Sequence, residues 1–131
     1  MDKELPDKRG VLLDMYGNAE FSRDLIRQFP MLRVDLEEDA GLLHVQMGTL
    51  AAAVRQALTL GQIELPLRIC QFLSETLNKP RAIPEIENAV AISFVEAREF
   101  RTTVTGRMVL DQMPKQVQQI LLQQERRGGA A

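Results

Sequence analysis

The stretch that decides the fold runs from Glu85 to Phe100 and reads EIENAVAISFVEAREF. Its inner residues are almost all apolar and cover every direction around a period of 3.6 residues: Ala89, Val90, Ala91, Ile92, Phe94, Val95 and Ala97. A helix that is apolar on all sides belongs inside a packed protein, so we predict one buried central helix over 85–100. The segment is too short, and too charged at its ends, to span a bilayer.

Helical spacing of apolar residues continues on both sides of this segment. It predicts helices over residues 19–29, 33–38, 43–60, 65–77 and 114–127. Gly61 is well placed to end the third of these, and the short connection after it predicts an antiparallel hairpin. Between Gly106 and Pro114 we expect a connector. RTTVT at 101–105 is the one strand-like run, and it is too short and isolated to form a sheet.

The expected fold class is therefore all-α. We predict a compact bundle of five to six helices in which the antiparallel hairpin packs on the buried central helix, an arrangement that is HEAT-like by analogy. At 131 residues the chain fits a single helical domain over 1–131. Residues 1–17 are expected to be a loosely ordered N-terminal segment, and 128–131 a disordered tail.

Gly48 interrupts the predicted helix over 43–60, where glycine costs about 1 kcal/mol relative to alanine. Two explanations are open at this point. Either a neighbouring helix approaches closely at Gly48, or the helix begins only at Thr49.

Composition bounds the function. The net charge is −2, and one tyrosine with no tryptophan leaves little for base stacking, so we expect no nucleic-acid binding. Cys70 is the only cysteine and lies in the apolar run ICQFL, which predicts a buried thiol rather than a nucleophile. The lone thiol and the absence of a signal-like N-terminus predict a cytoplasmic protein.

The candidate binding residues fall in two groups. Glu37, Glu38 and Asp39 precede His44, the only histidine, and could be hard ligands for a divalent ion. The other interpretation is that these acids interact favourably with the start of the following helix. We expect no metal and no cofactor, because the Glu-x-x-His signature of helical di-iron proteins is missing.

Asn88 and Glu96 form the second group. They lie two turns apart in the predicted central helix, on roughly the same side, so they could share a cleft. If that helix is buried, its polar groups need partners, and Arg55, Arg68, Arg98 and Arg101 are candidates. An ion pair of Glu96 with one of them would be structural rather than functional.

Three segments carry a resemblance to a known family: LLHVQMGTLA at 42–51, LRICQFLSETL at 67–77 and EIENAVAISFVE at 85–96. Over roughly residues 20–125 the chain resembles an uncharacterised family of small bacterial all-helical proteins, described as a domain of unknown function. The resemblance implies a bacterial source and a small all-helical fold. It assigns no catalytic residue or ligand to any position.

We hypothesise a non-enzymatic protein that works by binding another protein. One concrete form is an immunity or antitoxin-like protein, whose acidic N-terminal third (ten acids and six bases in residues 1–40) would complement a basic toxin. The alternative is a small-molecule- or metal-binding protein with a site near His44, Asn88 and Glu96. A third hypothesis is a homodimer whose interface is the methionine- and leucine-rich face of the hairpin or of the C-terminal helix.

Overall fold

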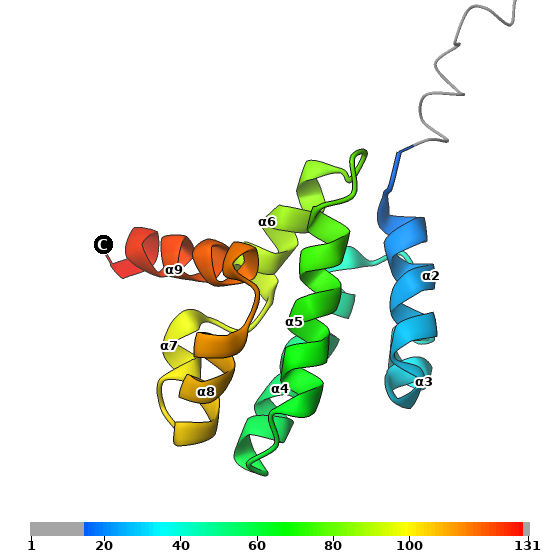
Figure 1. Ribbon diagram of the computed structural model, residues 1–131. Helices are drawn as coiled ribbons and strands as arrows, with labels where there is room; N and C mark the ends of the chain where they lie inside the picture. The colour runs from blue at the N-terminus through cyan, green and yellow to red at the C-terminus, as the bar shows by residue number, and fades with distance from the viewer. Residues whose placement is uncertain (1–14, 130–131) are drawn as a thin grey trace, which may run out of the picture.

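The computed structural model describes residues 15–129, with side chains to Arg127 (Figure 1). Within that range the fold is all-helical and comprises eight α-helices and one short 3-10 helix, more than the five to six helices expected. They are α2 (Asn18–Gln28), η2 (Pro30–Leu32), α3 (Arg33–Glu38), α4 (Leu43–Thr59), α5 (Glu64–Leu77), α6 (Pro84–Ser93), α7 (Ala97–Phe100), α8 (Val104–Gln112) and α9 (Lys115–Gly129). None of these helices has the length and apolar character needed to cross a membrane.

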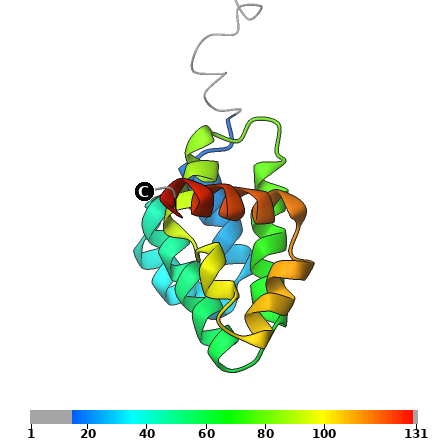
Figure 2. The same ribbon diagram turned by 90° about the vertical axis from the view of Figure 1, so that its left-hand side faces the viewer.

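The helices form three layers (Figures 1 and 2). The antiparallel hairpin of α4 and α5 lies in the middle, with α2 and α3 on one side and α7, α8 and α9 on the other. Helix α6 packs against α4 and α9, between the hairpin and that second outer layer. Met47, Leu50 and Val54 of α4 are fully buried between the layers. Ile86, Ala89 and Val90 of α6 are also fully buried, and α6 packs against α4, so the hairpin and α6 together form the centre of the fold.

The turn of the hairpin has a Schellman geometry. Gly61 has φ +73°, and its N–H donates to the carbonyl of Leu58 at 3.1 Å, while the N–H of Gln62 donates to the carbonyl of Ala57 at 2.9 Å. The left-handed conformation favours glycine, so the predicted end of α4 and the short connection are both confirmed.

Both explanations offered for Gly48 are wrong. Helix α4 begins at Leu43 and continues through Gly48 without a break. A Cβ atom added at Gly48 would meet no atom within 4 Å, so no neighbour approaches it closely.

The prediction of one continuous buried helix over 85–100 is also wrong. Helix α6 ends at Ser93, the next three residues are not helical, and α7 begins at Ala97. Nor is the segment buried on all sides, because the side chain of Ile92 is 59 % exposed. Polar contacts with α4 accompany this break and are described with the site below.

Helix α8 occupies the stretch where we expected a strand-like run and a connector. Thr103 caps its N-terminus, since the Thr103 hydroxyl accepts a hydrogen bond from the N–H of Gly106 at 2.9 Å. Gly106 in turn lets the helix approach α7: an added Cβ would lie 2.2 Å from the carbonyl oxygen of Phe100. The threonines of RTTVT thus start a helix rather than a strand.

At the ends of the chain, most of the expected loose segments lie outside the described residues (1–14 and 130–131). Tyr16 is held in place, because its N–H donates to the carbonyl of Arg81 at 2.8 Å and its carbonyl accepts from Ile83 at 3.0 Å. Its hydroxyl donates to Asp24 at 2.6 Å. Helix α9 extends to Gly129.

Candidate functional site

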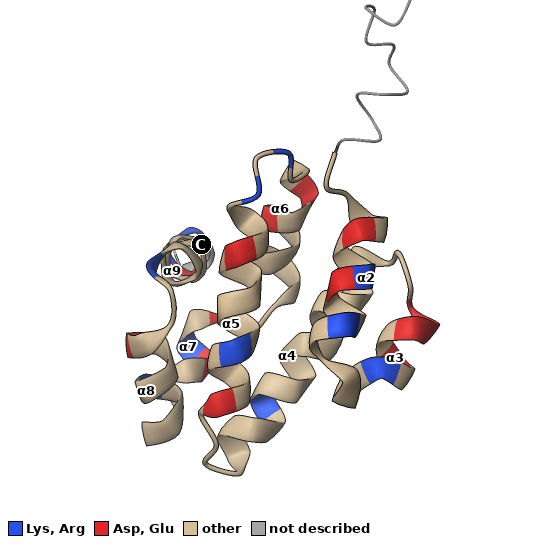
Figure 3. Cartoon of the chain, turned by 45° about the vertical axis from the view of Figure 1, so that its right-hand side comes forward, with Lys and Arg blue, Asp and Glu red and all other residues tan. Residues whose placement is uncertain are grey.

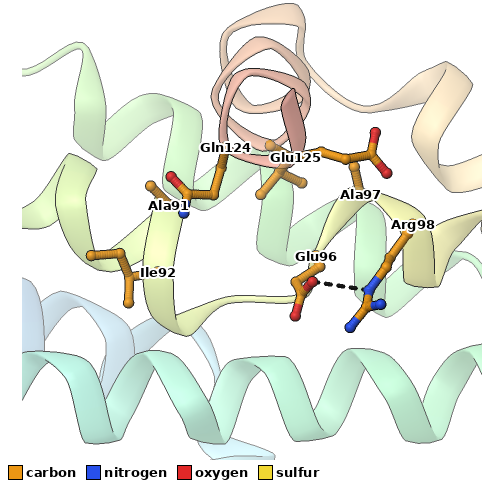
Figure 4. Close-up of a pocket in the computed structure, with 8 residues that line it drawn as sticks. Ala91, Ile92, Glu96, Ala97, Arg98, Gln124 and Glu125 are labelled. Atoms are coloured by element: carbon orange, nitrogen blue, oxygen red, sulfur yellow. Dashed lines mark ion pairs between the residues drawn. The ribbon is translucent and has the colours of Figure 1, made fainter. Parts of the chain in front are cut away.

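A cleft of about 560 Å³ opens between the end of α6, the start of α7 and the second half of α9 (Figure 4). Ala97 and Leu121 line it but are almost fully buried, so the apolar surface that the cleft exposes comes mainly from Ile92 and half-buried Ala91. The remaining lining side chains are charged groups and one amide. The lining residues are Ala91, Ile92, Glu96, Ala97, Arg98, Leu121, Gln124 and Glu125.

The cleft exists because the chain leaves the helical path after Ser93. Phe94 is extended (φ −90°, ψ −175°) and so is Glu96 (φ −75°, ψ 150°), which is the N-cap residue of α7. The N–H of Glu96 donates to the carboxylate of Glu99 at 2.8 Å, which satisfies a donor at the start of α7. Phe94 and Val95 are buried at this point, so the break is packed into the core.

Glu99 also fastens the break to α4. Arg55 of α4 donates two hydrogen bonds to the Glu99 carboxylate, from Nε at 2.7 Å and from Nη2 at 3.1 Å. This paired geometry is the strongest that arginine and carboxylate form. The hydrogen bond from Arg55, followed by that from the Glu96 N–H, holds the pKa of Glu99 below its usual value, although partial burial acts in the opposite sense.

A second paired salt bridge fixes α9 over the cleft. Arg101, just after α7, donates to Glu125 of α9 at 2.6 Å and 2.9 Å. This contact lowers the pKa of Glu125 and raises that of Arg101. Glu125 lines the cleft, so its contact with Arg101 fixes the position of one negative charge of the cleft.

The exposed charges of the cleft are paired with each other. Glu96 and Arg98 form a salt bridge of 3.0 Å, drawn as a dashed line in Figure 4. The arginine partner expected for Glu96 is thus Arg98, but the pair is exposed rather than buried, with side-chain exposures of 56 % and 73 %. A pair so exposed contributes little to stability, so both groups can turn to a ligand at small cost.

Asn88 and Glu96 do not share the face on which the prediction placed them. The helix that would have aligned them ends at Ser93, between the two residues. Asn88 is exposed on α6 and does not line the cleft, whereas Glu96 does.

His44 is exposed at the start of α4, and its Nδ1 lies 2.6 Å from Oγ of Ser93, the last residue of α6. A serine and a histidine can act as nucleophile and base when a third group orients the histidine. In the described part of the chain no acidic side chain hydrogen-bonds to His44; the contact joins the start of α4 to the end of α6. Sequence spacing gave no sign of this contact, since the residues are 49 positions apart.

The acidic run at 37–39 lies at the end of α3. Glu37 pairs with Arg33 one turn earlier at 3.0 Å, and Asp39 is the C-cap residue of that helix. The first turn of α4 contains no acidic residue, so the predicted interaction with the start of that helix is wrong. Figure 3 shows basic as well as acidic residues on both α2 and α3, so this layer is of mixed charge.

Cys70 is buried, as expected, and burial raises the pKa of its thiol to about 12. A thiol with that pKa is not a nucleophile at neutral pH. Between residues 15 and 129 no three His, Cys, Asp or Glu side chains are grouped closely enough to hold a metal ion.

Among the lining residues, sequence reasoning missed Leu121, Gln124 and Glu125 of α9, and it also missed Glu99, which holds the start of α7 beside the cleft. Glu96 and Glu99 have the N-cap-to-N3 spacing of a capping box, but the usual signature begins with serine or threonine. Leu121 was recognised as apolar, yet its place in the cleft depends on how α9 packs against α6 and α7.

Comparisons with known proteins place the chain in a family. No curated protein matches it, and no solved structure does. The model of one family matches residues 22–127, which is most of the chain and includes the whole cleft. The resemblance drawn from the sequence is thereby confirmed, while a bacterial source stays a prediction. The chain belongs to the family described as domain of unknown function DUF7674.

Proposed function

We propose that this chain is a non-enzymatic protein-interaction domain, and that a short segment of its partner lies in the cleft between α6, α7 and α9. The observation that carries this proposal is that exposed apolar surface, at Ile92 and Ala91, and charged side chains line one open cleft. Fully buried apolar contacts surrounded by polar ones are the usual anatomy of a protein interface.

The lining residues favour a particular kind of segment. An apolar partner side chain would contact exposed Ile92 and half-buried Ala91. Glu96 and Glu125 would accept hydrogen bonds from a lysine, an arginine or the partner backbone. The expected segment therefore has an apolar residue next to a basic one.

An immunity or antitoxin-like role, in which the partner is a toxin domain, is one concrete form of this proposal. It no longer needs an acidic N-terminal face, because the carboxylates of the cleft would meet the basic groups of the toxin. A cytoplasmic location remains part of the proposal.

Affinity capture with a matched pair of variants tests it. Ala91→Trp would fill the cleft from α6, while Ala19→Trp places the same side chain on an exposed position of α2, in the opposite outer layer. We expect a stoichiometric partner to be captured by the natural chain and by Ala19→Trp, and to be lost with Ala91→Trp. Equal capture by both variants would exclude the cleft as the docking site.

A further inference from the structure

The segment between α6 and α7 has a sequence that can form a helix, although it is not helical. From Glu85 to Thr105 there is no glycine and no proline. At Phe94 and Glu96 φ is −90° and −75°, close to the helical value, so mainly a rotation in ψ separates both residues from a helix. No residue of this hinge, defined as 94–96, has a positive φ.

The buried residues around the hinge also fit a continuous helix. They follow one another at intervals of three or four positions: Ile86, Val90, Phe94, Ala97 and Phe100. In a helix over 84–100 these side chains would share one face. Val95 is the exception, since it is buried now and would point away from that face.

The hinge divides the described chain into an N-terminal part (15–93) and a C-terminal part (97–129). The salt bridge between Arg55 and Glu99 crosses from one part to the other. In contrast, the bridge between Arg101 and Glu125 lies within the C-terminal part, so that part would keep it if it moved as a unit.

We propose that two copies of this chain exchange their C-terminal parts, with each hinge straightened so that α6 and α7 become one helix. A straightened hinge carries α9 away from α6, and the apolar side chains Val117 and Leu121 then need a cover. The surface that fits Val117 and Leu121 is the one that covers them in the monomer, and a second copy offers the same surface. Exchange of identical elements is a low-cost route to dimers, because it reuses the contacts of the monomer.

The exchange would build the cleft from two chains. Ala91 and Ile92 would come from one copy, and Leu121, Gln124 and Glu125 from the other. The partner that this fold accommodates is therefore a second copy of the chain, joined through contacts that the monomer already makes. The purified chain alone is sufficient to test this.

The first test separates exchange from simple surface association. In a Cys70→Ala background, one sample carries Ala91→Cys and another carries Gln124→Cys. The two are mixed, partly unfolded in urea and refolded at high concentration, and then treated with a short bis-maleimide cross-linker. We expect a covalent product that contains one chain of each kind, because residues 91 and 124 line the same cleft. Monomers alone by light scattering, or dimers without this cross-link, would overturn the proposal.

The second test uses two substitutions at one hinge position. Glu96→Ala and Glu96→Gly both remove the exposed carboxylate, but alanine favours a helix over glycine by about fivefold in equilibrium constant. A dimer contains two hinges, so its association constant should be about 25-fold larger for Glu96→Ala than for Glu96→Gly. Equal dimer fractions by sedimentation would show that the hinge does not become helical.

The third test concerns the contact that holds the hinge. Glu99→Ala removes the salt bridge between the two parts and should speed the exchange about fivefold, whereas Glu125→Ala removes a similar bridge within one part and should leave the rate unchanged. Equal effects of the two variants would contradict the division of the chain at 94–96.

Discussion

Gly48 lies in the middle of α4 and Gly106 lies in α8, and alanine at these two positions should change the stability in opposite directions. A Cβ atom at Gly106 would lie 2.2 Å from the carbonyl oxygen of Phe100 and 2.8 Å from its carbonyl carbon. Favourable contacts between such atoms begin beyond 3 Å, so α7 and α8 would have to separate by about 1 Å. At Gly48 the added methyl group meets nothing within 4 Å.

The magnitudes follow from these two environments. Overpacking of a rigid site costs about 1 to 3 kcal/mol, and the close approach to backbone at Gly106 places it at the upper end. Alanine returns at most about 1 kcal/mol of helix propensity, so Gly106→Ala should destabilise the fold by about 2 kcal/mol. Gly48→Ala gains the propensity without the clash and should stabilise the fold by about 0.5 to 1 kcal/mol.

Urea unfolding followed by circular dichroism measures both free energies, and Gly48→Ala serves as the matched control for the propensity gain. We expect the two midpoints to fall on opposite sides of the natural one, with unchanged dependence on urea concentration. A Gly106→Ala variant as stable as the natural protein would refute the reasoning, because the Phe100 carbonyl would then not be held against α8.

Three further predictions concern titration and reactivity. Tyr16 is the only tyrosine, and its pKa is raised mainly by burial and, second, by the hydrogen bond to Asp24. Phenolate absorbance should therefore appear well above pH 10 in the native state and near pH 10 in urea. Because the folded pKa is raised, this stabilisation is complete below pH 10 and is lost as the pH rises further. Arg55 lowers the pKa of Glu99, so the stabilisation of the fold by ionised Glu99 is present above the unfolded pKa of about 4.3 and is lost as the pH falls. Glu99→Gln should therefore flatten the fall in stability below about pH 5. An unchanged slope would count against the contact. Cys70 should react with a thiol reagent only after unfolding, and fast modification of the native protein would contradict its burial.

The helices that the sequence predicts well are those whose signals are local. Residues 33–38 and 65–77 agree with α3 and α5 to within a residue at either end. Gly61 marks the turn of the hairpin because a left-handed conformation strongly favours glycine. Spacing of apolar residues and a turn glycine act over a few positions, so they can be recognised without the tertiary structure.

The candidate site was only partly accessible from the sequence. Glu96 was selected for the right reason, as a charge within an apolar stretch, but its supposed neighbour Asn88 lies outside the cleft. The contacts that shape the site join residues 24 and 44 positions apart, Arg101 with Glu125 and Arg55 with Glu99. A single sequence contains no signal that pairs them.

By itself, the sequence determined that the chain is all-helical, where the hairpin turns, and that Cys70 is buried. Only the tertiary structure decided that the helix over 85–100 is broken. Nothing local stops a helix there, since the stretch has neither glycine nor proline. The break coincides with Val95 burying its side chain and with Arg55, from another layer, binding Glu99. A moderate helix propensity is overridden when burial of a side chain and a paired salt bridge both favour a non-helical backbone. In this protein the non-helical backbone at 94–96 forms one side of the cleft.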